Sequence, residues 1–245
     1  MKMISTILDR FKYFGLRKLY YFLLDTGIIF PTKQTLIQRG VSRKLITYFG
    51  GDSGHNINSS LYFIGFGLIH YAILRNCRPK RILCVGSDMG YIPAILALAC
   101  KDNAYGHVDF VDAGYGKESP ALHWGGSAFW KNVNPQKHFN MLHLSSFITT
   151  HVMKSKLFSK RFPRHRYQYI YIDGDHSYQG VKTDFKLFWP MLESGGFMVF
   201  HDIVAKGHLD GGTFGVWKFW NELSGTHTIQ FSFPKDSGLG FIQKQ

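Results

Sequence analysis

The sequence is short of several features, and each shortage argues against a class of protein. Only three cysteines occur among 245 residues, Cys77, Cys84 and Cys100, and they form no CxxC pair. This argues against a disulfide scaffold and against a cysteine-ligated zinc site. Cys84 lies in an apolar strand-like run and Cys100 ends an alanine-rich helical run, so we expect buried, reduced thiols in an intracellular protein.

Long apolar runs, repeats and low-complexity tracts are also missing. The most apolar stretch, LYFIGFGLIHYAIL at residues 61–74, is too short to favour a membrane span and predicts a buried helix. No small-residue cleavage site follows an apolar run near the N-terminus, so we expect no signal peptide and a cytoplasmic location. The hydrophobic content of 45% predicts one compact domain, with or without a small extension.

Acidic residues are scarce, with 16 Asp and Glu against 29 Lys and Arg, which gives a formal net charge of +13. The basic residues gather in residues 1–50 and in KSKLFSKRFPRHR at residues 154–166. Such patches can meet phosphate, anionic lipid or nucleic acid, or can be solvated surface, which we favour. Residues 11–21 interleave basic and aromatic side chains, a pattern of helices at an anionic membrane surface, or of helices packed on their own domain, the interpretation we favour.

From about residue 59 the chain alternates strand-like and helix-like segments. Strands are predicted at residues 81–87, 107–113, 140–146, 167–173 and 197–203, and two final strands at 227–233 and 239–244 form an antiparallel pair. Helices fill most of the intervals, which predicts an α/β fold whose parallel sheet is covered on both faces. Ligands bind such sheets beyond the carboxyl ends of the strands. The basic segment 154–166 precedes its strand, which disfavours nucleic acid as a partner.

A glycine turn follows the first predicted strand and an acid ends the second. The stretch GSDMGY brings glycines to a strand-to-helix turn, where backbone N–H groups can approach a ligand. Asp112 follows at an interval typical of a carboxylate that binds a ribose diol. A tight turn needs glycine in any case, so the turn alone is a weak signal. The candidate cofactor contacts are Gly86, Ser87, Asp88, Gly90, Tyr91, Asp112 and Asp173.

Two further strand ends carry acids and imidazoles, in YIYIDGDHS and in FHDI. If those strands are neighbours, Asp173, Asp175, His176, His201 and Asp202 converge in one cleft. Isolated carboxylates would repel one another and raise one another's pKa values, and a divalent cation such as Mg²⁺ or Ca²⁺ would resolve that repulsion. A group outside the coordination shell could act as general base. The alternative is a helix N-cap at Ser177 with unrelated surface acids.

These motifs together resemble class I S-adenosylmethionine-dependent methyltransferases. Within that superfamily the block IDGDHSYQGVKTDF…WPML…GG…VFHDI resembles O-methyltransferases of natural-product and glycan sugars, a group that includes cephalosporin-hydroxylase-like proteins. The resemblance covers roughly residue 60 to the C-terminus. It implies a Rossmann-like three-layer α/β/α sandwich with a seven-stranded sheet, preceded by a helical extension over residues 1–58.

The resemblance also implies roles for the singled-out residues. Gly86 and Gly90 would border the methionine part of S-adenosylmethionine, and Asp112 would bind its ribose. Asp173 and Asp202, with His201 as a third ligand, would hold Mg²⁺, and the candidate bases are Asp175 and His176. The acceptor would be a hydroxyl of a small molecule or glycan.

Two departures from the family pattern keep other readings open. Cys84 stands where the family has an acid that contacts the methionine ammonium, and Asp88 replaces a loop glycine. A non-catalytic binding or scaffold protein, and methylation of RNA or another polyanion, therefore remain alternatives. The aromatic segment 114–132 is predicted to form a lid or cleft wall, or to pack on the sheet. Whether the chain forms homo-oligomers is not decided by the sequence.

Overall fold

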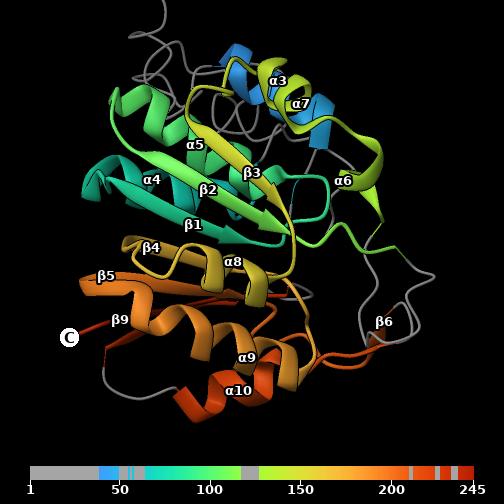
Figure 1. Cartoon of the computed structure of the whole chain (residues 1–245), viewed down its shortest axis with the longest axis vertical. Coiled ribbons are helices and arrows are strands. Elements are labelled where there is room, and N and C mark those ends of the chain that lie inside the picture. The colour runs from blue at the N-terminus through green and yellow to red at the C-terminus, as the bar shows by residue number, and fades with distance from the viewer. Residues whose placement is uncertain are drawn as a thin grey trace, which may run out of the picture. The chain divides into compact units, whose positions relative to one another are not determined.

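The computed structural model describes residues 39–49, 55, 57, 64–116, 127–209, 212–223, 227–232 and 237–245 (Figure 1). Contacts divide the chain into two compact units, residues 1–51 with 57–64, and residues 52–56 with 65–245. The described part of the first unit is helix α3 (Arg39–Phe49), together with residues 57 and 64. The basic-aromatic pattern of residues 11–21 lies outside the described residues, and the boundary after residue 58 stays a prediction.

The second unit is built on a seven-stranded sheet with the order β3-β2-β1-β4-β5-β9-β8. The first five of these strands are parallel, and β9 is antiparallel to both β5 and β8. The predicted mostly parallel sheet with a C-terminal antiparallel hairpin is therefore confirmed. The strands are β1 (Arg81–Val85), β2 (His107–Asp112), β3 (Ile148–Val152), β4 (Tyr167–Ile172), β5 (Leu192–His201), β8 (Thr228–Phe231) and β9 (Leu239–Gln243).

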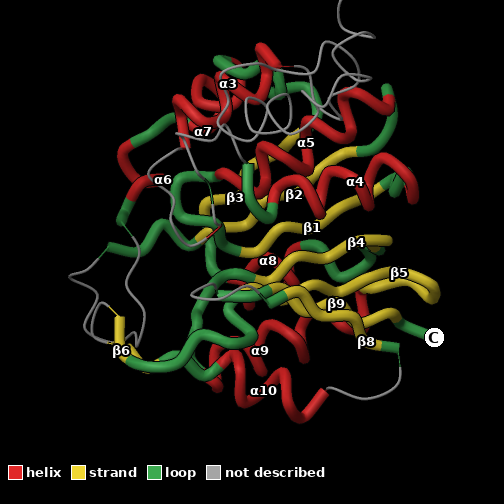
Figure 2. The backbone as a smooth tube through the Cα atoms, turned by 180° about the vertical axis from the view of Figure 1, so that it is seen from behind, coloured by secondary structure: helices red, strands yellow, loops and turns green. Residues whose placement is uncertain are grey.

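Helices cover both faces of this sheet, which gives the predicted three layers (Figures 1 and 2). One face carries α4 (Gly67–Cys77) and α5 (Tyr91–Asn103). The opposite face carries α8 (Ser155–Arg161), α9 (Tyr178–Phe188) and α10 (Val216–Leu223). The smaller elements are α6 (Phe129–Asn132), α7 (Pro135–Asn140), the 3-10 helix η2 (Trp189–Met191), β6 (His208–Leu209) and β7 (Gly212–Thr213).

Strand β4 shows why the sheet is buried on both faces. Successive side chains of a strand point to opposite faces. Ile170 and Ile172 join the core beneath α9 and α10, whereas the rings of Tyr169 and Tyr171 lie against His70 of α4. Each fully buried isoleucine contributes about 1.5–3 kcal/mol of hydrophobic stabilisation. This two-sided burial brings the end of β4, and the acids that follow it, to a fixed place at the edge of the sheet.

Two expectations about the fold were wrong. The predicted strand at residues 140–146 is the end of α7 and the turns after it, and the strand β3 begins at Ile148. Asn134 caps α7 by accepting a hydrogen bond from the N–H of Lys137, the helix ends at Asn140, and the apolar residues that follow form turns before β3. Among the cysteines, Cys84 and Cys100 are buried as expected, but Cys77 at the end of α4 is exposed.

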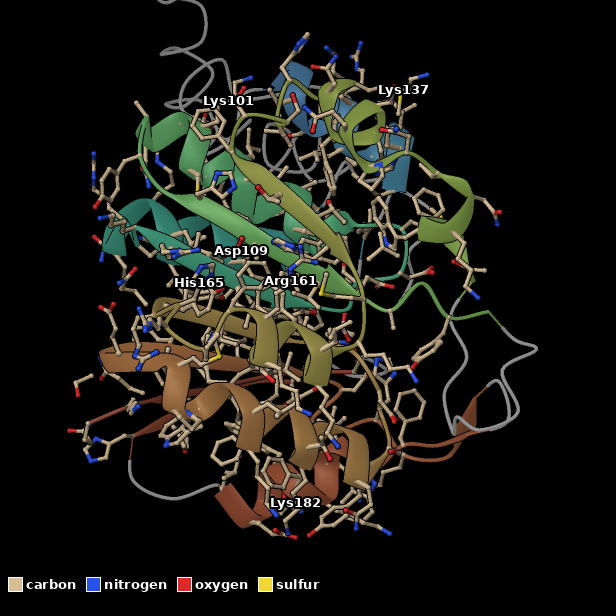
Figure 3. All side chains as sticks on the ribbon, viewed as in Figure 1. Lys101, Asp109, Lys137, Arg161, His165 and Lys182 are labelled. Atoms are coloured by element: carbon tan, nitrogen blue, oxygen red, sulfur yellow. The ribbon has the colours of Figure 1, made fainter. Side chains whose placement is uncertain are left out.

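An ionic cluster lies within the sheet at Asp109, which is labelled with His165 in Figure 3. The buried Asp109 carboxylate accepts hydrogen bonds from Arg81 and Tyr167, each at 2.9 Å, and pairs with His151 at 3.1 Å. Burial would raise the pKa of Asp109, but these partners lower it. This acid therefore ties β1, β2, β3 and β4 together. Among the described residues, no helix is long and apolar enough to cross a membrane.

Candidate functional site

The turn after β1 touches the end of β4. Gly86 follows Val85 with φ of +72°, and its N–H donates to the carbonyl of Val111 at 2.8 Å. A Cβ at Gly86 would lie 2.2 Å from the backbone oxygen of Asp173. Only glycine fits where two loops approach this closely in a left-handed conformation. The predicted glycine turn therefore places the ends of β1 and β4 in direct contact.

The rest of the turn prepares the start of α5. Buried Ser87 accepts hydrogen bonds from the N–H of Gly90 through its carbonyl, at 2.6 Å, and from that of Ile92 through Oγ, at 3.3 Å. Gly90 caps the helix with φ of +88°. The exposed side chain of Asp88 accepts a hydrogen bond from the Ser127 hydroxyl, so it is turned toward the loop that precedes α6.

Tyr91 begins α5 and is fully buried. Its hydroxyl lies so close to Gly67 that a Cβ there would be 2.3 Å away, and its ring meets that of His55 edge-on, at 5.6 Å between centroids. The side chain therefore faces α4 and His55. A cofactor contact by Tyr91 stays a prediction, and so do the contacts assigned to the other turn residues.

Trp130 of α6 holds this turn from the other side. Its indole N–H donates to the carbonyl of Asp88 at 2.6 Å, and its ring would contact a Cβ added at Gly90. The ring is 4% exposed and packs on Phe110 and Phe139. Trp130 therefore packs on the sheet, which was one of the two interpretations of the aromatic segment. Residues 117–126, including Trp124, lie outside the described residues.

Asp112 ends β2 beside the glycine turn, as predicted. Its Oδ1 accepts a hydrogen bond from the N–H of Gly114 at 2.7 Å. Burial raises the pKa of Asp112 to about 6, and the charges of Asp88 and Asp173 add to the increase, while hydrogen bonds from backbone N–H groups oppose it. Asp112 ends the strand on one side of β1, and Asp173 follows the strand on its other side. This acidic edge suits a ligand that brings positive charge or hydroxyl donors.

The acids and imidazoles after β4 and β5 form one buried cluster, as predicted. Asp173 Oδ1 lies 3.2 Å from His176 Nε2 and 3.1 Å from His201 Nδ1. Asp202 Oδ2 lies 3.1 Å from His176 Nδ1, and its Oδ1 lies 3.4 Å from His201 Nδ1. Asp202 adopts a left-handed φ of +62°, which is strained for a residue other than glycine. Two carboxylates and two imidazoles thus alternate around a common centre.

The electrostatics of this cluster differ from the expectation. Burial would raise the pKa of Asp173, but the charge of His201 and hydrogen bonds from His176 and His201 hold it well below its usual range. Burial would likewise raise the pKa of Asp202, but His201 and His176 lower it. The charge of Asp173 does raise the pKa of Asp202, as predicted, but the imidazoles between the two carboxylates dominate, so the pKa values of both acids are lowered.

The imidazoles respond in the opposite direction. Burial would lower the pKa of His201, but Asp202 and Asp173 raise it well above its ordinary value. The pKa of His176 is raised for the same reasons, with burial again opposing. The two carboxylates therefore favour the protonated form of each imidazole. The imidazoles in this way offset the repulsion between the carboxylates that was the argument for a cation.

Asp175 has a different environment from His176. Its Oδ1 accepts a hydrogen bond from the N–H of Ser177 at 2.9 Å, and its carboxylate lies against Gly180 in the first turn of α9. Ser177 is the N-cap, as the alternative interpretation supposed, since its Oγ accepts from the N–H of Gly180 at 3.0 Å. Asp175 therefore stabilises the helix start, while His176 lies inside the cluster. Which of the two acts as base stays a prediction.

Sequence reasoning missed His55, which completes the cluster. Its Nε2 lies 3.3 Å from Asp173 Oδ2 and 3.1 Å from the hydroxyl of Tyr171. That hydroxyl donates to the same carboxylate oxygen at 3.1 Å. His55 falls in the predicted extension and has no neighbouring motif. The only signal in the sequence was its place in the glycine-rich stretch GGDSGHN, because glycine allows two backbones to approach closely.

Three comparisons show which known proteins the chain is similar to. Residues 83–203 match a family described as a methyltransferase domain. The O-methyltransferase TomG from Streptomyces achromogenes, solved with S-adenosylmethionine, superposes with a TM-score of 0.56 at 14% identity and covers 85% of this chain and 92% of its own. An O-methyltransferase from Bacillus cereus, solved with S-adenosylhomocysteine, gives a TM-score of 0.55 at 11% identity, and the match covers 90% of this chain and 94% of that protein.

A curated relative from Sinorhizobium fredii, the uncharacterized protein y4gI, is 36% identical over 73 residues, which are 30% of this chain and 8% of that protein. The chain therefore spans a small part of that relative's length. The comparisons confirm the predicted fold, and residues 83–203 are similar to a methyltransferase domain. The narrower likeness to cephalosporin-hydroxylase-like proteins stays a prediction.

Proposed function

We propose, from the premise that this chain carries a class I methyltransferase domain, that it transfers the methyl group of S-adenosylmethionine to a hydroxyl of a small molecule or glycan. The observation that carries the proposal is the buried cluster of carboxylates and imidazoles beside the glycine turn. Fold alone does not assign a reaction, but acid–base groups where the fold binds its ligands do indicate one.

The acidic edge supports the choice of cofactor. S-adenosylmethionine carries a positively charged sulfonium and ammonium group and a ribose with two hydroxyl donors. Asp112 ends β2 and Asp173 follows β4, the strands on either side of β1, so both acids flank the turn at Gly86, and Asp88 lies within that turn. Oδ1 of Asp112 takes the N–H of Gly114, which orients the carboxylate at the strand end. The residues present therefore fit a cationic, hydroxyl-bearing cofactor.

Methyl transfer to a hydroxyl requires removal of a proton from a weak acid. Of the two candidate bases, His176 lies inside the cluster between Asp173 and Asp202, whereas Asp175 accepts the N–H of Ser177 at the start of α9; His176 would take the proton in its neutral form. His176 lies between Asp173 and Asp202, so its ring is held in one orientation and can exchange protons with either carboxylate. Enclosure of the cluster strengthens each of these interactions by excluding water.

Metal assistance is a secondary component of this proposal. Asp173, His201 and Asp202 are the residues that would hold a divalent cation such as Mg²⁺, and their side chains do meet. Such a cation lowers the pKa of a bound hydroxyl. The fit to Mg²⁺ is poor in one respect, because two imidazoles stand among the carboxylates and Mg²⁺ prefers oxygen ligands. The protein's own groups are therefore the basis of the proposal.

The test is calorimetric titration of the purified chain with S-adenosylmethionine and S-adenosylhomocysteine, followed by a screen of hydroxyl acceptors with a radiolabelled methyl donor. His176→Ala should keep cofactor affinity while kcat falls on the order of 10²–10⁴-fold. Asp175→Asn is the matched comparison and should have the smaller effect on kcat. A larger fall in Asp175→Asn would assign the base to Asp175.

One alternative has a specific observation in its favour. Cys84 stands where an acid would contact the methionine ammonium, and burial raises the pKa of its thiol well above the usual value, so it is neutral. A chain that binds neither S-adenosylmethionine nor S-adenosylhomocysteine would support a non-catalytic scaffold. The basic segment 154–166 gives little support to a polyanion substrate, because it runs between the two edges of the sheet. Lys154 follows β3 at the carboxyl edge, whereas Arg166 precedes β4 at the opposite edge.

A further inference from the structure

We propose that His55, Asp173 and His201 bind a divalent first-row transition-metal ion, such as Mn²⁺, Fe²⁺, Co²⁺ or Zn²⁺, in preference to Mg²⁺. This inference deepens the proposed function, because the ion would lie within the cluster assigned to deprotonation. It differs from the ligand set predicted from the sequence, in which His55 had no part. The inference depends on which atoms meet and on what orients them.

The donor atoms converge from three separate parts of the chain. Nε2 of His55 lies 3.3 Å from Oδ2 of Asp173, and Nδ1 of His201 lies 3.1 Å from Oδ1 of the same carboxylate. One ligand atom from each residue falls within 4.8 Å of the others. The two imidazole rings stack at 4.5 Å between centroids with 18° between their planes. Both imidazoles therefore present a ring nitrogen to the carboxylate of Asp173.

The surroundings orient these donors as the surroundings of metal ligands do. Nε2 of His201 is hydrogen-bonded to the hydroxyl of Ser237 at 2.8 Å, which turns the other ring nitrogen, Nδ1, toward Asp173. The hydroxyl of Tyr171 donates to Oδ2 of Asp173. The carbonyl of His55 accepts the N–H of Phe66 at 3.0 Å, which anchors its backbone. Hydrogen bonds of this kind from neighbouring groups fix the ring orientation of ligating histidines.

The chemistry of the donors selects the ion. Imidazole nitrogen suits zinc, copper, iron and nickel, whereas magnesium takes carboxylate, carbonyl and water oxygens and keeps several waters. Two imidazoles and one carboxylate form a donor set used for iron(II) with open coordination positions. The side chains are 4–6% exposed, so there is little room for the water shell that Mg²⁺ retains. Nitrogen donors and burial both disfavour magnesium.

A second donor set, Asp173, His176 and Asp202, shares the same carboxylate. Both nitrogens of His176 face carboxylates, at 3.2 Å and 3.1 Å, so this imidazole already bridges two acids. The set that contains His55 has two imidazoles and one carboxylate, whereas the second set has one imidazole and two carboxylates, and nitrogen donors favour a transition metal. We therefore place one ion per chain at the set that contains His55.

The test uses the full chain without an affinity tag, treated with chelator and then titrated with Co²⁺, Zn²⁺ and Mg²⁺ by calorimetry. The visible absorption of bound Co²⁺ gives a second readout that requires no acceptor. One Co²⁺ should bind per chain with affinity on the order of 10²-fold or more above that of Mg²⁺. Equal affinity for Mg²⁺, or no binding of Co²⁺, would overturn the inference.

Variants identify the ligands. His55→Gln should lower Co²⁺ affinity by about 10²-fold or more, and Ser237→Ala, which leaves every ligand in place, should lower it by about 10–100-fold. His143→Asn removes an exposed imidazole at a left-handed position that asparagine tolerates, and should bind Co²⁺ like the parent chain. Unchanged affinity in both His55→Gln and Ser237→Ala would show that the ion, if bound, is held elsewhere.

Titration of the same samples with S-adenosylmethionine separates this inference from the proposed function. Cofactor binding without Co²⁺ binding refutes the metal site and leaves the methyltransferase proposal intact. Co²⁺ binding without cofactor binding supports the metal site and counts against the methyltransferase proposal. Retained cofactor affinity in His55→Gln also shows that the variant is folded, so that its loss of Co²⁺ affinity supports the assignment.

Discussion

Asp184 is expected to make the protein less stable as the pH rises, and Asp184→Asn should remove that loss. The residue lies on the buried face of α9, with an exposed fraction of 6%, and its carboxylate faces Gly174. Burial raises its pKa from 3.8 to about 7, a hydrogen bond from Ser155 opposes the increase, and the charge of Asp175 adds to it. The charged form is therefore disfavoured in the folded protein and not in the unfolded chain.

The sign and size follow from linkage. An acid whose pKa is raised on folding contributes stability that is fully present below its unfolded pKa and is lost as the pH rises through its folded pKa. For Asp184 that window runs from about pH 4 to about pH 7. A pKa difference of one between the folded and unfolded states corresponds to about 1.4 kcal/mol, so the full loss is about 4 kcal/mol, of which about 2.5 kcal/mol falls between pH 5 and pH 8.

Urea unfolding of Asp184→Asn and the parent chain at pH 5, 6, 7 and 8 measures this directly. The difference in the free energy of unfolding should grow in favour of the variant by about 2.5 kcal/mol across the series, because asparagine keeps the shape of the side chain and cannot ionise. Glu222→Gln serves as the control: hydrogen bonds from Tyr178 and Lys182 lower the pKa of Glu222 below its usual 4.5, so its titration lies below this pH range and the difference should be nearly flat. A flat difference for Asp184→Asn as well would refute the reasoning, since burial could then not be raising its pKa.

Three further predictions concern the glycine turn and the cofactor edge. Gly86→Ala should destabilise the chain by more than about 3 kcal/mol in urea unfolding, whereas Gly195→Ala, also at positive φ but with open space around it, should cost about 1–2 kcal/mol; equal losses would show that the contact with Asp173 is unimportant. Asp112→Ala should weaken S-adenosylmethionine binding by roughly 1.5–3 kcal/mol in calorimetry, and unchanged affinity would remove Asp112 from the cofactor site. S-adenosylmethionine should slow hydrogen exchange in residues 114–132, and an unchanged rate there would contradict a lid.

The sequence allowed the strands of the sheet centre to be located because they are buried on both faces. Continuous apolar runs such as YIYI and FMVF are typical of fully buried strands, and they differ from the helical spacing of the segments between them. The edge strand β3 was misplaced for the corresponding physical reason. An edge strand is covered less completely, so ITTHV contains polar residues, and its β-branched residues are a weaker signal than the nearby apolar NMLHL.

The residues of the candidate site could be predicted where the strand order places them together. They could not be predicted where only contacts between distant parts of the chain bring them together. Asp173 and Asp202 follow the neighbouring strands β4 and β5, and adjacent parallel strands end at the same edge. Asp184 also had a signal, since it lies three residues after Val181 and four before Phe188, on the apolar face of its helix. His55 is far from Asp173 in the chain, and no periodicity relates the two.

The role of the histidines could not be derived from the positions of the acids alone. Treated as isolated charges, Asp173 and Asp202 require a cation to relieve their repulsion. In the folded protein His176 and His201 lie between them, and the carboxylates raise the pKa of both imidazoles, which favours the charged form of each. The cluster can therefore form before any metal binds, and an ion that enters must displace protons from an imidazole. An all-carboxylate site would lack this exchange, and it would also lack the nitrogen donors that distinguish a transition metal from magnesium.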